Sequence, residues 1–389
     1  MTDLQALATE AGAWRRELHQ MPEILFDLER TADFVAEKLE AFGCETHRGI
    51  AKTGIVAVIE GDGSPGPTIL LRADMDALPM EERTNLPHAS KHPGRMHACG
   101  HDGHTAMLLA AARRLAAERA HSGRVVLCFQ PAEEGGHGAR VMIEEGLLDR
   151  FSIDEVYAIH NQPGLPVGAF ASRPGPMLAA GDRFVITLRG RGGHAAAPHL
   201  ANDPMLAQAQ LVTALQSIAS RRTDPMDQAV ASVTWVAAGS LEALNVIPAE
   251  VRLGGSIRAL KPDTRRQNEQ HLRDIVAGVA ATFNMEAELD WRPGYPVTVN
   301  DPAATEAALA VARAIGTGTV NGDCAPEMGS EDFSYMLKRR PGALLWIGNG
   351  DSAELHSPSY DFNDSAILPG IRFWLELIHQ RLPGRGMLL

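Results

Sequence analysis

The chain has 389 residues, of which 45% are hydrophobic, so it exceeds one ordinary hydrophobic core and two globular domains are expected. Its 36 Lys and Arg residues stand against 48 Asp and Glu residues, and the net charge of −12 disfavours nucleic acid as a partner. No segment approaches the roughly 20 apolar residues of a membrane span, and the first residues lack the pattern of a signal peptide. We therefore expect a cytoplasmic protein with no membrane partner. Its four cysteines, Cys44, Cys99, Cys128 and Cys324, are too few for a disulfide framework in a chain of this length.

The first third of the chain begins with a helix predicted over residues 12–42, followed by apolar strands at 55–60 and 68–74. The glycines of residues 61–66 match the spacing of a dinucleotide-binding loop. They lead into Pro67 and a second strand instead of a helix, however, so the phosphate-binding geometry is missing. We interpret residues 61–66 as a hairpin turn.

Helices and strands then alternate: helix 103–120, strand 124–130, helix 138–146 and strand 155–160. Such alternation predicts an α/β fold with a mixed, mostly parallel sheet flanked by helices.

The middle of the chain has a different pattern, which we interpret as an inserted domain at residues 179–292. The expected order is β-α-β-β-α-β, the order of a ferredoxin-like α+β unit, with segments at 183–189, 203–221, 229–237, 251–260, 262–283 and 286–291. Residues 1–178 and 293–389 would then form the catalytic domain. Its last elements are a helix capped by Asp301 and Pro302 and ending at 315, a strand at 343–347 and a helix at 367–381.

Residues 97–104 (HACGHDGH) hold the densest group of metal-binding residue types in the chain. If this segment is extended, Cys99 and His101 point the same way and can bind one metal ion. The motif alone is weak, because a polar loop with satisfied histidines is the commoner explanation.

Three further segments place such residues after apolar strands. Glu133 and Glu134 follow strand 124–130, His160 ends the next strand, and His356 follows strand 343–347 across a Gly-rich loop. Ligands of open α/β sheets bind at the carboxyl ends of the strands. Four separate segments therefore place such residues at one edge of the predicted sheet. An alignment of all four would rarely arise by chance.

The paired acids Glu133 and Glu134 suggest a division of roles. Two adjacent glutamates standing alone would indicate a solvated turn. Beside a metal site, one can bind the ion while the other accepts a proton from the nucleophilic water. The sequence lacks a Gly-x-Ser-x-Gly elbow, a His-Glu-x-x-His helix and a phosphate-binding loop. Cys99 as a nucleophile stays an alternative to Cys99 as a ligand.

These motifs together resemble the aminoacylase and carboxypeptidase superfamily of two-metal hydrolases, and within it the hippurate hydrolase and indole-acetyl-amino-acid hydrolase type. The resemblance runs nearly end to end. It is carried by residues 74–79 (DMDALP), 97–104, 130–136 (QPAEEGG), 193–199 (GHAAAPH), 245–248 (NVIP), 329–333 (GSEDF) and 355–356 (LH).

The resemblance implies two divalent metal ions per subunit, with Glu133 as the general base. It implies these metal ligands: Cys99, His101, Glu134, His160 and His356. The inserted domain would form dimer contacts. His194 and Asn245 would contact the substrate or its oxyanion, in the same or the partner subunit's site.

Three further residues are assigned from their chemistry. Arg258 is predicted to pair with a substrate carboxylate, because a guanidinium matches a carboxylate at two points. Asp74 and Asp102 are expected to orient histidine ligands without binding metal themselves.

The predicted function is hydrolysis of the amide bond of a small N-acyl amino acid by a homodimer or higher oligomer. Thiolate and imidazole ligands favour zinc, while the resemblance also allows manganese, cobalt or nickel. Alternatives are a dipeptidase, an N-acyl-diaminopimelate-type deacylase, and a metal-binding module without catalytic activity.

Overall fold

The computed structural model describes residues 3–384 and divides into two compact units. The first unit comprises the chain up to Gly175, then Val299–Ala325, and the chain from Asp332 onward. The second comprises Pro176–Thr298 with Pro326–Glu331. Within residues 3–384, no helix has both the length and the apolar character needed to cross a membrane.

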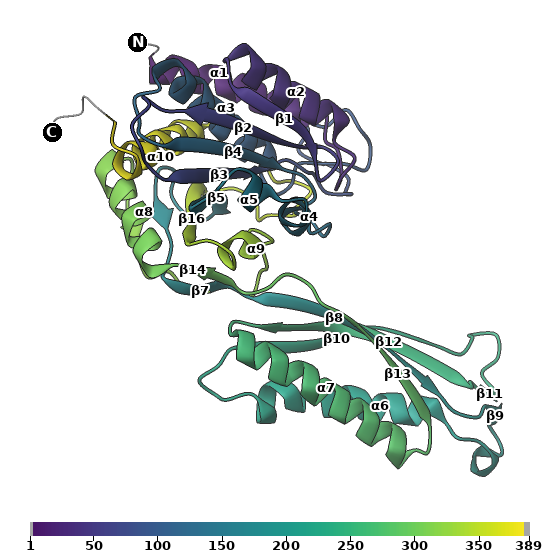
Figure 1. Cartoon of the computed structure of the whole chain (residues 1–389). Helices are drawn as coiled ribbons and strands as arrows, with labels where there is room; N and C mark the ends of the chain where they lie inside the picture. Colours follow the sequence, from purple (N-terminus) through teal and green to yellow (C-terminus); the bar gives the residue numbers. More distant parts are fainter. Residues whose placement is uncertain (1–2, 385–389) are drawn as a thin grey trace. The chain divides into compact units, whose positions relative to one another are not determined.

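The first unit is built on an eight-stranded sheet in the order β1-β2-β4-β3-β5-β16-β6-β15. The pairs β4-β3, β3-β5, β5-β16 and β6-β15 are parallel, so the prediction of a mixed, mostly parallel sheet with flanking helices is confirmed (Figure 1). Its strands are β1 (Glu45–Ile50), β2 (Gly54–Glu60), β3 (Thr68–Asp74), β4 (Arg124–Gln130), β5 (Glu155–Pro163), β6 (Phe170–Ala171), β15 (Val320–Asn321) and β16 (Gly342–Gly350). Its helices are α1 (Leu4–Gln20), α2 (Glu29–Ala41), α3 (His101–Glu118), α4 (Gly138–Glu144), α5 (Leu147–Arg150), α8 (Pro302–Ile315), α9 (Ser334–Leu337) and α10 (Ile367–Arg381).

The main core lies between this sheet and a helical layer that contains α1, α2, α3, α8 and α10. Alternate strand residues face it, as Ile69 and Leu71 of β3 and Ile159 of β5 do. Neighbouring side chains along each strand alternate between the two faces of the sheet. The four adjacent strands β4, β3, β5 and β16 run parallel, so their carboxyl ends lie at one edge of the sheet.

Two predictions about the N-terminal region are wrong. Residues 12–42 form two helices instead of one, because the chain turns after Pro22 and Ile24 forms a β-bridge with Ala77. Residues 61–66 are not a hairpin turn, since β4 lies between β2 and β3 and pairs with both. The loop instead packs on the segment before β4, where the backbone amide of Asp62 donates to the carbonyl oxygen of His121.

The second unit contains a four-stranded antiparallel sheet in the order β10-β12-β8-β13, with α6 and α7 packed against it. This is the strand order of a ferredoxin-like unit. Its elements are β8 (Ala180–Arg189), β9 (Gly193–His194), α6 (Pro204–Leu215), β10 (Ala229–Ala238), β11 (Val246–Ile247), β12 (Glu250–Ala259), α7 (Pro262–Thr282) and β13 (Glu286–Arg292). Strands β7 (Gly175–Leu178) and β14 (Thr298–Asn300) mark the chain segments at the boundaries of the unit.

Candidate active site

Glu133 and Glu134 lie in the tight turn that follows β4. The turn contains Ala132 at φ 57° and Gly135 at φ 103°, and the second of these values is one that only glycine adopts readily. Both glutamates are held by one carboxylate, because Asp76 accepts hydrogen bonds from their backbone amides at 3.0 Å each. The backbone of the two acids is therefore fixed before any ligand binds.

Cys99 and His101 precede and begin α3, and the predicted extended conformation of this segment is wrong. Gly100 between them is left-handed, with φ 88°, and His101 is the first residue of the helix. The two side chains nevertheless reach the same region, because both are buried beside Glu134. A helix start, and not strand alternation, brings them together.

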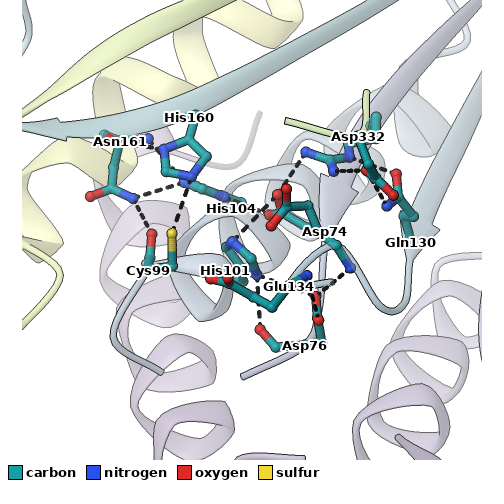
Figure 2. A network of polar contacts seen from close by, with 12 residues as sticks. Asp74, Asp76, Cys99, His101, His104, Gln130, Glu134, His160, Asn161 and Asp332 are labelled. Carbon is teal, nitrogen blue, oxygen red and sulfur yellow. Dashed lines mark hydrogen bonds and ion pairs between the residues drawn. The ribbon is translucent and has the colours of Figure 1, made fainter. Parts of the chain in front are cut away.

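His160 lies within β5, three residues before the strand ends, rather than just past its end. Its Nε2 atom is 3.4 Å from Sγ of Cys99, as Figure 2 shows. His356 approaches from the loop after β16, with its Nε2 atom 3.2 Å from Oε1 of Glu134 and 52% of its side chain exposed. The structure thus brings the five predicted ligands into one cluster.

The cluster contains two overlapping sets of donor atoms that share Glu134, and a further set joins His160 and His101 to Asp74 and His104. In one set, donors of Cys99, Glu134 and His356 lie within 4.8 Å of one another. In a second set, the same holds for His101, Glu133 and Glu134. The overlap gives two neighbouring groups of donors suited to cations, joined by the carboxylate of Glu134, with Glu133 a member of the second group.

The two buried histidines present the nitrogen that a metal ion requires. Nδ1 of His101 lies 2.8 Å from the carbonyl oxygen of Asp76, and Nδ1 of His160 lies 2.8 Å from that of Asn161. A carbonyl oxygen can only accept, so Nδ1 carries a proton in both rings, and Nε2 is the nitrogen left to face a metal ion. Nε2 of His101 is buried with no hydrogen-bond partner among residues 3–384. Ligands of metal sites have this arrangement.

The charges around the cluster also suit cations. Burial alone would lower the pKa of His101, but the carboxylates of Asp74 and Asp76 outweigh it and raise that pKa to about 10. Burial, reinforced by Glu134 and Glu133, raises the pKa of the Cys99 thiol well above its usual range. The surplus of buried acid therefore needs a positive partner, and a thiolate forms here only beside one.

Asp74 and Asp102, expected to orient histidine ligands, have different partners. Asp74 accepts a hydrogen bond from Nδ1 of His104 at 2.6 Å, and its other oxygen lies 3.6 Å from Nε2 of His101. Asp102 accepts a hydrogen bond from Nδ1 of His19 at 2.8 Å, and His19 lies outside the cluster. Asp102 therefore orients His19.

The remaining predicted residues, His194, Asn245 and Arg258, belong to the second unit, whereas the cluster belongs to the first. His194 and Asn245 are exposed and adjacent, since the amide of Ala195 donates to the carbonyl oxygen of Asn245 at 2.9 Å. One guanidinium nitrogen of Arg258 donates to the carbonyl oxygen of Met328 at 2.6 Å.

Sequence reasoning gave no role to several buried polar residues around the cluster. Asp76 and His104 were visible in the motifs at 74–79 and 97–104, but only tertiary contacts show what they touch. A further group, Arg72, Gln130, Asn161, Asp332 and Tyr360, continues the same hydrogen-bond network. Figure 2 shows Gln130, Asn161 and Asp332 of this group.

Comparison with known proteins agrees with this geometry. The sequence profile of peptidase family M20/M25/M40 matches residues 70–380. N-acetyl-L-cysteine deacetylase of Bacillus subtilis is 39% identical over 96% of this chain and 88% of its own length. Hippurate hydrolase of Campylobacter jejuni is 41% identical over 93% of this chain and 94% of its own length. The crystal structure of a dinuclear metal-binding M20 peptidase from Bacillus subtilis superposes with a TM-score of 0.84 at 35% identity, covering 96% of this chain and 98% of that one.

Proposed function

Because the chain belongs to peptidase family M20/M25/M40, we propose that it is a metal-dependent amidohydrolase that cleaves a small N-acyl amino acid into a carboxylic acid and a free amino acid. The observation that carries the proposal is the pair of overlapping donor sets that share Glu134, the second of which includes Glu133. The names of the deacetylase and the hippurate hydrolase support the substrate class.

We infer that Cys99, His101, Glu134, His160 and His356 hold two divalent ions. When bound, the ions lower the pKa of water and polarise the amide carbonyl. Zinc suits the thiolate and imidazole donors, and manganese, cobalt or nickel are further candidates. Four free cysteines within the described chain support a reducing compartment such as the cytoplasm.

Glu133 acts as the general base in this proposal. Its backbone amide is fixed by Asp76 at 3.0 Å, and its carboxylate lies within the donor set formed with His101 and Glu134. From this position the carboxylate takes a proton from the attacking water and delivers it to the leaving nitrogen. His194 and Asn245 would contact the substrate or stabilise the oxyanion, in the same or the partner subunit's site, and Arg258 would bind the substrate carboxylate.

A homodimer through the second unit completes the proposal. Among the described strands, β10 lies at the edge of its sheet and pairs with β12 alone. Apolar side chains along it and in the following loop are exposed, with Trp235 at 44%, Val236 at 46% and Leu241 at 80%. Such an apolar edge is typical of a strand that pairs with another chain.

The test is a hydrolysis panel with protein reconstituted with each of the four metals. Hippurate, N-acetyl and indole-acetyl amino acids should release free amine, detected with ninhydrin, and chelator should abolish the release. Preference for unblocked dipeptides or for N-acetyl-diaminopimelate would replace the substrate class by one of those alternatives. Two bound ions without turnover of any substrate would leave only metal binding.

A further inference from the structure

His104, three residues after His101 on α3, hydrogen bonds with two different strands. Its Nδ1 atom lies 2.6 Å from Oδ1 of Asp74, and its Nε2 atom lies 3.0 Å from the backbone nitrogen of Asn161. A carboxylate only accepts and an amide only donates, so Nδ1 carries the proton and Nε2 accepts. The lone pair of His104 is therefore used within the protein, although His104 lies within 4.8 Å of donors of His101 and His160.

The side chain of Asn161 extends this connection to Cys99. Its Nδ2 atom donates to the carbonyl oxygen of Cys99 at 2.6 Å, and its Oδ1 atom accepts from the hydroxyl of Tyr360 at 2.5 Å. A Cβ atom at Gly100 would lie 2.2 Å from Nδ2 of Asn161, so only glycine lets the amide approach this closely. Asn161 is fully buried.

Asp74 is held in turn at the other end of the network. Arg72, itself buried, donates to Oδ2 of Asp74 at 2.6 Å, and its other nitrogens reach Gln130 at 2.9 Å and Asp332 at 3.1 Å. His104 is therefore anchored to β3 and β4 through Asp74, and it holds the backbone of β5 directly after His160 (Figure 2).

We propose that His104 is a positioning residue which, with Asp74 and Asn161, fixes the separation of Cys99 and His160. The proposal rests on the proposed function, since it gives that separation a purpose only if both residues bind metal. Cys99 lies before α3 and His160 lies on β5, so the two come from segments that could move apart. His104 and Asn161 tie both segments to one point, and thus prearrange the two ligands at their 3.4 Å contact.

Preorganised ligands bind an ion more tightly, because no conformational freedom is lost on binding. Removing a partner that orients a ligand typically costs about 10- to 100-fold in metal affinity. We expect a loss of this size for His104→Leu, which removes both hydrogen bonds. His104→Gln, whose amide oxygen can accept from the backbone amide of Asn161, should recover part of it.

The experiment is titration of metal-free protein with cobalt(II), following the absorption of a thiolate bound to cobalt. His104→Leu should require about 10- to 100-fold more cobalt to develop this absorption, with His104→Gln in between. His121→Leu is the matched control, because His121 is also buried and follows the opposite end of the same helix. It should titrate like the wild type.

Thermal unfolding of the metal-free proteins separates positioning from general stability. A merely structural role would lower the melting temperature of His104→Leu and leave the cobalt affinity of the folded protein unchanged, and this result would overturn the proposal. Should His104→Leu not fold, Asn161→Ala, which releases the carbonyl oxygen of Cys99, is judged by the same criterion. A wild-type absorption that is missing, or that persists in Cys99→Ala, would contradict the proposed function itself.

Discussion

The thiol of Cys99 lies 3.4 Å from Nε2 of His160, although 61 positions separate the two residues in the sequence. Both are buried, and the pKa of each moves toward its neutral form: burial and nearby carboxylates raise that of the thiol, while burial and the neighbouring His104 lower that of the imidazole. Two uncharged metal-ligating groups in contact are typical of a cation site before the ion binds.

Replacing Cys99 should therefore remove metal. We expect Cys99→Ala to lose at least one of two bound ions and to lower kcat/KM by about 100-fold, as measured by elemental analysis and the hydrolysis panel. Cys128→Ala is the control, because Cys128 is also buried but contacts Met142 outside the cluster. Full metal content in Cys99→Ala would remove the thiol from the ligand set.

Glu133→Gln should separate catalysis from binding. The amide keeps the shape of the side chain but cannot accept a proton, so turnover should fall by at least about 100-fold while both ions remain. Glu144→Gln, an exposed carboxylate on α4, should keep wild-type activity. Substantial turnover by Glu133→Gln would assign the base to another residue.

Asp76→Asn tests whether one carboxylate holds the turn of both glutamates. An amide can accept only through its oxygen, and its NH2 group would face one of the two backbone amides that now donate to Asp76. We expect metal affinity and kcat to fall together by about 10- to 100-fold. The exposed Asp323 supplies the control, Asp323→Asn. If only KM changed in Asp76→Asn, the carboxylate would act on the substrate and not on the turn.

The pH dependence of stability should depend on His19. Burial would lower its pKa, but hydrogen bonds to Asp102 and Glu82 raise it to about 9 from an ordinary 6.5. Because the folded state binds this proton more tightly than the unfolded state, the stabilisation is complete below pH 6.5 and is lost as the pH rises through 9. In urea unfolding of metal-free protein, His19→Gln should cost on the order of 3 kcal/mol at pH 6 and progressively less up to pH 10. A cost that does not vary with pH would show that His19 is neutral.

Val236→Lys tests the proposed dimer. Light scattering should change from twice the chain mass of 41.8 kDa to a single chain mass, because a lysine on an edge strand opposes pairing. Val299→Lys places the same charge at an exposed valine of the first unit and should leave the mass unchanged. A wild-type protein that is already monomeric would contradict the dimer.

The sequence predicted features that local chemistry determines. Asp301 caps α8 as expected, accepting from the amide of Ala304, and Pro302 begins the helix, which ends at Ile315. The wrong predictions concern features that depend on contacts between segments far apart in the sequence. The hairpin prediction at residues 61–66 was wrong because β4, synthesised some sixty residues later, separates the two strands. No local pattern marks that insertion.

The same distinction holds for the site. The end of β4 indicated where Glu133 and Glu134 would lie, whereas His160 lies within β5 instead of just past its end. The hydrogen-bond partner of Asp102 could not be predicted, because it depends on how the first turn of α3 packs against His19 of α1. Asp76 and His104 lay inside recognised motifs, yet their partners come from the turn after β4 and from β5.

The division of the first unit between both ends of the chain has a consequence for synthesis on the ribosome. All four strands of the second unit's sheet lie between Ala180 and Arg292, whereas the first unit needs β16, which begins at Gly342. A growing chain can therefore complete the second unit first, while β5 and β6 wait with an open neighbour position for β16. During that interval the hydrophobic strands of the catalytic half are exposed, and we expect this half to be the one that depends on chaperones.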